Sequence, residues 1–106
     1  MAYVYQVSFD IRPEQMGQLE IGASLERVLA YLRALLPSEA GYITSRAMSS
    51  LDYPERTHVI VQSVWDSWED LARHRRSSLA EDKVLSEFEP HVALGDLAVH
   101  AYEEVA

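Results

Sequence analysis

The sequence predicts an α+β protein of the ferredoxin-like class, in which four antiparallel strands form one sheet and two helices cover one of its faces. Segments with alternating apolar side chains and segments with helical periodicity follow one another in the order β-α-β-β-α-β. The strongest strand, residues 58–65, is apolar on both faces, which indicates that both faces of the sheet are covered. The 106 residues fit one domain, 1–106, with a single modest core.

The first predicted strand spans Tyr3–Ile11, where an apolar face alternates with a polar one, and Pro13 ends it. Residues 24–36 repeat leucine and valine at steps of three and four, which predicts a helix with one apolar stripe that ends at Pro37. The stretch 14–23 is ambiguous because its two glycines weaken a helix. It is open to interpretation as a loop, a broken first turn of helix, or part of a lid.

Two further strands are predicted on either side of a turn. Residues 41–49 form the second strand, and Asp52 and Pro54 mark a turn over residues 50–56. Residues 58–65 form the third strand. Both of its faces carry apolar side chains: Ile60 and Val64 on one, and Val59, Val61 and Trp65 on the other.

The second helical region begins at Ser67, which is a favoured N-cap residue, with Asp70 at the N3 position. A further helical piece over residues 81–89 ends at Pro90, and residues 94–105 form the last predicted strand. The predicted buried stripe of the helical region consists of Trp68, Leu71, Ala72 and Leu79.

Two helices can cover only one face of a four-stranded sheet, so the second apolar face of residues 58–65 needs another layer. A chain of 106 residues does not supply that layer, whereas a second copy of the same sheet would. We therefore expect a homodimer, since two-fold dimers are the commonest oligomers.

The composition excludes several classes of function. Nine basic and seventeen acidic residues give a formal charge of −8, which disfavours nucleic acid and anionic membrane surfaces as partners. There is no cysteine, so disulfides, zinc–thiolate sites and thiol nucleophiles are excluded. No stretch has the length and hydrophobicity of a membrane span, and the first residues lack the pattern of a signal peptide. We expect a cytoplasmic protein.

The run from Val64 to His74, VWDSWEDLARH, resembles a signature of the antibiotic biosynthesis monooxygenase family: a strand ending in Trp, a Ser-capped helix and then a His. Gly41-Tyr42 and the turn Asp52-Tyr53-Pro54 fit the same pattern. The resemblance implies a dimeric α+β barrel with a cavity between helices and sheet in each subunit. It also implies oxidation of aromatic polyketides or quinols by molecular oxygen without metal or flavin, or, in another branch, heme degradation.

The sequence departs from both branches at their functional positions. The polyketide-oxidising relatives have an Asn and a Tyr where this chain has Val61 and Leu71. The heme-degrading branch has an Asn in the first strand, where this chain offers Gln6 and Ser8, and a late helical His, whereas residues 81–89 contain none. We therefore expect no heme and no other bound cofactor.

Two residues of the run are candidate catalytic residues. Trp65 is either a packing residue of the core or dimer, or a cavity wall whose indole donates a hydrogen bond to a bound aromatic. His74, which the helical periodicity places well to the side of the apolar stripe, is either a helix histidine favoured by the dipole or a base at the cavity mouth, as the family pattern implies.

Other candidates would bind the substrate. Tyr5 and Trp68 are aromatic candidates, and Arg76 belongs to a basic cluster with Arg73 and Arg75. This cluster is either a solvated helix face or an anchor for an anionic or phenolate substrate.

A metal site is not expected, because His58, His91 and His100 lack the spacing of metal ligands. No phosphate-binding loop or nucleophile elbow is present.

Two functions remain open. The first is cofactor-independent monooxygenation of a small aromatic, phenolic or quinol-type substrate, which needs a base, a dry aromatic pocket and a hydrogen-bond donor. The second is a non-catalytic dimeric module that binds a small hydrophobic ligand in the same pocket.

Overall fold

The computed structural model describes residues 1–52, 54–92 and 97–106. The elements are β1 (Tyr3–Ile11), α1 (Gln18–Leu35), the short 3-10 helix η1 (Leu36–Ser38), β2 (Tyr42–Ser49), β3 (Thr57–Trp65), α2 (Trp68–Ser77), α3 (Leu79–Phe88) and β4 (Ala98–Glu103). The predicted ferredoxin-like α+β class is confirmed. The order is β-α-β-β-α-α-β, because the second helical region is divided in two.

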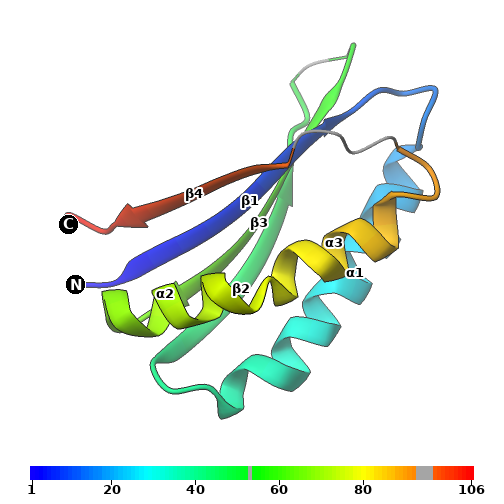
Figure 1. The fold of residues 1–106 in the computed structure, drawn as a ribbon. Helices are drawn as coiled ribbons and strands as arrows, with labels where there is room; N and C mark the ends of the chain where they lie inside the picture. Colours follow the sequence, from blue (N-terminus) through cyan, green and yellow to red (C-terminus); the bar gives the residue numbers. More distant parts are fainter. Residues whose placement is uncertain (53, 93–96) are drawn as a thin grey trace.

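The sheet has the strand order β2-β3-β1-β4, and all neighbouring strands are antiparallel. In the register of β1 and β3, Tyr3 lies opposite Trp65 and Ile11 opposite Thr57. Figure 1 shows that the helices all lie on one face of the sheet. In the described part of the chain, the sheet therefore has one face covered by helices and one face that no helix covers.

The alternation of β1 is the clearest case in which the sequence determines a local structure. The strand has the predicted bounds, and its side chains Tyr5, Val7, Phe9 and Ile11 are all buried under the helices. Phe9 meets Phe88 of α3 edge to face, with ring centroids 4.9 Å apart. The edge-to-face geometry is favourable for aromatic pairs, and the contact packs β1 against α3.

Helix α1 begins six residues before the predicted start at residue 24, at Gln18. The helix includes Gly22, where a side chain would meet nothing within 4 Å, and Gly17 is its N-cap residue. The ambiguous stretch 14–23 is thus a turn followed by helix, because the packing of Ile21 and Leu25 in the core outweighs the low helix propensity of glycine.

Ser67 caps α2 as predicted, since its hydroxyl oxygen accepts a hydrogen bond from the backbone N–H of Asp70 at 3.1 Å. Helix α2 ends at Ser77, because Ser78 adopts a left-handed conformation with φ of 55°. Helix α3 then begins at Leu79, two residues before the predicted piece 81–89. The left-handed residue Ser78 separates Leu79 from α2, so the predicted stripe of Trp68, Leu71, Ala72 and Leu79 spans two helices.

The last strand is shorter than predicted. Within the range 94–105, β4 covers Ala98–Glu103, and residues 94–96 lie outside the described residues. Its alternation is as predicted: Val99 and Ala101 are half-buried, whereas Ala98 and His100 are exposed. In the predicted turn 50–56, Tyr53 also lies outside the described residues.

The face of the sheet opposite the helices is called the open face here. Its members follow from the strand register: Val4, Gln6, Ser8 and Asp10 of β1, Thr44, Arg46 and Met48 of β2, His58, Ile60, Gln62 and Val64 of β3, and Ala98, His100 and Tyr102 of β4. A polar row crosses it, because Arg46 donates to Gln62 at 2.6 Å and Gln62 donates to Gln6 at 2.8 Å.

Candidate active site

The start of α2 is fixed against the end of the sheet by a glycine contact. Gly41 has φ of +82°, and a Cβ at this position would overlap the carboxylate of Asp70. The backbone N–H of Asp66 donates to the Gly41 carbonyl at 2.8 Å. Asp70 also accepts a hydrogen bond from the Ser67 hydroxyl at 2.8 Å and pairs with Arg73. The carboxylate therefore joins the loop before β2 to the first turn of α2.

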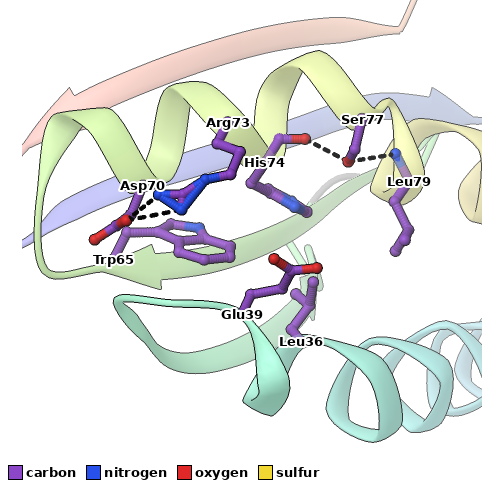
Figure 2. Close-up of a pocket in the computed structure, with 8 residues that line it drawn as sticks. All are labelled: Leu36, Glu39, Trp65, Asp70, Arg73, His74, Ser77 and Leu79. Carbon is purple, nitrogen blue, oxygen red and sulfur yellow. Dashed lines mark hydrogen bonds and ion pairs between the residues drawn. The ribbon is translucent and has the colours of Figure 1, made fainter.

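A cavity of about 220 Å³ lies next to this junction. Figure 2 shows it between α2, the end of β3 and the segment that follows α1. Its lining residues come from these elements and from the start of α3: Leu36, Glu39, Trp65, Asp70, Arg73, His74, Ser77 and Leu79. The two residues predicted to be catalytic, Trp65 and His74, thus lie together at one cavity.

His74 is only 6% exposed, in contrast to the prediction that it lies off the buried side of the helix. Its ring stacks on Trp65 with centroids 4.8 Å apart, and its Nε2 is buried without a hydrogen-bond partner in the described part of the chain. Burial disfavours the imidazolium and lowers the pKa of His74 to about 4. At neutral pH the side chain is therefore a neutral imidazole that can accept or donate a hydrogen bond at the cavity.

Trp65 is almost fully buried and forms an aromatic wall. Its indole N–H donates to the Ser63 hydroxyl at 2.9 Å, and Tyr42 meets the ring edge to face at 5.6 Å. Of the two alternatives for Trp65, a hydrogen bond from the indole to a bound aromatic would need an N–H that is already bonded within the chain. Trp65 therefore contributes its aromatic surface to the cavity, and the hydrogen bond to Ser63 holds the indole in place.

Tyr5 lies beside His74 and is not among the lining residues of the cavity. Its ring meets His74 edge to face at 5.2 Å, and its hydroxyl donates to Glu81 at 2.7 Å. Burial and the neighbouring carboxylate together raise the pKa of the Tyr5 phenol well above its usual value. Tyr5 is therefore a neutral hydrogen-bond donor that supports the histidine from the side of the sheet.

Trp68 and Arg76 do not line the cavity. Trp68 is 48% exposed and contacts Tyr3, because it is the first residue of α2. Its predicted place in the buried stripe is wrong. Arg76 is exposed on α2. Of the basic cluster, Arg73 alone borders the cavity, and its charge is paired with Asp70.

Glu39 lines the cavity although it is exposed to solvent and no sequence pattern singles it out. Its position at the cavity depends on the turn from η1 into β2, and an isolated glutamate next to Ala40 and Gly41 carries no pattern that would have indicated it. Ser77, three residues after His74 on α2, and Leu36, at the end of the predicted helix 24–36, also line the cavity and were not singled out as site residues.

The described residues hold no group of three or more His, Asp or Glu side chains that could bind a metal ion. Elsewhere His58 bonds to Asp10 through Nδ1 at 2.8 Å, and both side chains are exposed. Among the described residues, no helix has both the length and the hydrophobicity that crossing a membrane requires.

No family model and no curated protein matches this sequence. Solved structures do match it. Rv0793 from Mycobacterium tuberculosis is 16% identical, with a TM-score of 0.62 over 100% of this chain and 97% of that one. A protein from Nitrosomonas europaea, named as a candidate antibiotic biosynthesis monooxygenase, is 13% identical, with a TM-score of 0.62 over 98% of this chain and 90% of that one.

A designed protein, Foldit4, also matches, with 11% identity and a TM-score of 0.57 over 99% of this chain and 100% of that one. The chain therefore has the fold of structures named as candidate antibiotic biosynthesis monooxygenases, and a protein made by design has this fold too. At these identities the likeness shows the fold alone, and function has to be argued from the cavity.

Proposed function

We propose that this protein is a cofactor-independent monooxygenase of a small phenolic or quinol-type aromatic, which binds in the cavity beside Trp65 and His74. The observation that carries the proposal is the buried, unpartnered Nε2 of His74 at the border of a cavity with an aromatic wall. A buried polar atom without a partner is rare in folded proteins, and functional sites are one place where it occurs. The fold shared with structures of that name supports the same class.

The size of the cavity limits the substrate. A cavity of roughly 150 Å³ accommodates one benzene ring. The 220 Å³ observed beside Trp65 is therefore suited to one ring or two fused rings rather than to a large polyketide. Leu36 and Leu79 add apolar lining, which favours the aromatic part of such a ligand.

The reaction requires little of the protein. A naphthol-type phenol donates its hydroxyl proton toward His74, and the resulting phenolate is electron-rich enough to reduce dioxygen. One oxygen atom becomes the second carbonyl of a para-quinone and the other leaves as water, so that the substrate loses two hydrogen atoms and gains one oxygen. No residue changes its oxidation state. The phenolate formed beside His74 stabilises the imidazolium, which offsets the effect of burial on its pKa.

His74→Gln tests this function, because an amide keeps hydrogen-bonding capacity but takes no proton. Oxygen consumption with a dihydroxynaphthalene should fall about 10²- to 10⁴-fold, as is typical when a general base is removed. The matched control is His91→Gln, since His91 is exposed after α3 and lies outside the cavity lining. Equal turnover by both variants and the unaltered protein would show that His74 takes no part in the reaction.

The alternative function, a non-catalytic module that binds a small hydrophobic ligand, is favoured by two specific observations. The low pKa of His74, about 4, makes it a weak base, and the Trp65 N–H is already bonded to Ser63. Calorimetry that detects binding of the same naphthalene diol without any oxygen consumption would establish this alternative.

We also propose that the protein is a homodimer that buries the open face, as the sequence led us to expect. The open face carries one formal negative charge, Asp10, and one formal positive charge, Arg46, in a chain with a net charge of −8. A face that is neutral within an acidic molecule is better suited to self-association than the rest of the surface, where like charges repel.

A further inference from the structure

Glu39 brings a negative charge to the cavity that no other lining residue balances. The lining contains four titratable or charged side chains: Glu39, Asp70, Arg73 and His74. Asp70 and Arg73 neutralise each other in an ion pair. His74 is neutral, and Glu39 forms no ion pair in the described part of the chain. The cavity therefore has a formal charge of about −1.

The backbone holds Glu39 in place on both sides. Its N–H donates to the Leu36 carbonyl at 2.8 Å, and its carbonyl accepts from the N–H of Tyr42 at 3.4 Å. Figure 2 shows its carboxylate directed from the segment after η1 into the cavity, toward the side where the imidazole of His74 lies. Besides the paired Asp70 and Arg73 and the Ser77 hydroxyl, the lining thus carries two more polar side chains, the carboxylate of Glu39 and the imidazole of His74, which stacks on Trp65.

We propose that Glu39 determines the substrate class of this cavity, which rests on the proposed function above. The carboxylate accepts a hydrogen bond and repels negative charge, so it selects an aromatic with a second donor, a hydroxyl or an amine, remote from the hydroxyl that faces His74. It rejects an aromatic that carries a carboxylate at the same position. Because Glu39 is exposed to solvent, screening keeps the discrimination moderate.

The test compares three naphthalenes by calorimetry without oxygen: a dihydroxynaphthalene with hydroxyls on opposite rings, a naphthol, and a hydroxynaphthoic acid with the carboxylate in place of the second hydroxyl. The unaltered protein should bind the diol most tightly and the acid most weakly. In Glu39→Gln, the ratio of the two dissociation constants, acid to diol, should fall by about threefold to tenfold, as expected for the loss of one partly exposed charge.

Glu69→Gln is the matched control. Glu69 is an exposed glutamate in the first turn of α2 that does not line the cavity, so this change removes the same charge from the chain without altering the ligand's surroundings. It should leave the ratio unchanged. Raising the salt concentration should reduce the discrimination of the unaltered protein and not that of Glu39→Gln.

The outcomes separate the two proposals. If the probes bind and Glu39→Gln shows the same ratio as the unaltered protein, the role of Glu39 is overturned and the proposed function stands. If the ratio falls as expected but no variant consumes oxygen, the role of Glu39 is supported and the cavity belongs to a binding module. If none of the three probes binds, both proposals are overturned.

Discussion

His74 is a titratable side chain that the fold holds in its neutral form. Its pKa is about 6.5 when exposed and about 4 in the folded chain, because burial disfavours the charged ring. Between these values the unfolded chain binds a proton that the folded chain rejects. The free energy of unfolding should therefore fall as the pH drops from about 6.5 to about 4, by on the order of 3 kcal/mol. Urea unfolding over this pH range measures it.

The control for this pH dependence is His74→Gln, which lacks the titrating ring. Other titratable or charged groups near the ring are Tyr5 and its partner Glu81 on one side, and Glu39, Asp70 and Arg73 at the cavity. They are shared by both proteins, so their titration cancels in the comparison. The variant should show the flatter curve above pH 4, whatever its absolute stability. Parallel curves for the two proteins would show that His74 is protonated in the folded state.

His74 and Glu39 also show how far single residues could be predicted from the sequence. The identity of His74 as a candidate came from its place after a Ser-capped helix start, but its burial did not, because the helical stripe was drawn through Leu79 across the break at Ser78. The stripe passes through Leu71 and His74, three residues apart on α2. Glu39 reaches the cavity only through tertiary structure, which no local pattern reports.

At the scale of an element, alanine substitutions at Gly41 and Gly22 should have opposite effects on the free energy of unfolding. Gly41 has a positive φ, and a methyl group there would displace Asp70 from the start of α2. Gly41→Ala should lower the free energy of unfolding by about 2 kcal/mol or more, since the left-handed conformation alone costs an L-residue about 1 to 2 kcal/mol. Gly22 lies in α1 with open space around its Cα, so Gly22→Ala should raise it by about 0.5 to 1 kcal/mol.

Chemical denaturation of the two variants beside the unaltered protein checks this pair of changes. The substitution is the same in both, so a difference in sign can come only from the backbone conformation and surroundings. Two destabilised variants of similar magnitude would mean that α1 does not extend through Gly22 in solution. A neutral Gly41→Ala would mean that Asp70 is not seated over the loop before β2.

Elements were predictable from the sequence where periodicity alone decides them. The bounds of β1 follow from strict alternation ended by Pro13, and the start of α2 follows from the cap at Ser67. The start of α1 was missed because glycine has a low helix propensity, whereas packing of Ile21 in the core stabilises the first turns. Local rules thus fail where tertiary burial outweighs them.

At the scale of the whole molecule, the sheet topology was predictable because the order of elements leaves few alternatives. The cavity was predictable only in outline. The run from Val64 to His74 indicated that Trp65 and His74 belong together, and they do stack. The size and charge of the cavity depend on Leu36 and Glu39, which approach from its other side.

The open face gives the last prediction, which concerns assembly. Ile60 lies on it, half-buried and opposite both Ser8 and Met48, and the face has no helix over it. Burying such apolar area against a second copy would stabilise the pair by roughly 25 cal/mol per Å² before the losses of association. Sedimentation at micromolar concentration should therefore give about twice the chain mass of 12.0 kDa.

Ile60→Glu identifies the face that is used. A carboxylate at this position would be buried without a partner in the dimer, so the variant should sediment as a monomer. Leu19→Glu is the matched control, because Leu19 is 91% exposed on α1, on the side of the sheet that the helices cover, and should leave the dimer intact. A monomeric unaltered protein would contradict the dimer itself. A dimer that survives Ile60→Glu would instead place the contact on another surface, and would leave the open face as a solvated one in which the polar row from Arg46 to Gln6 faces water.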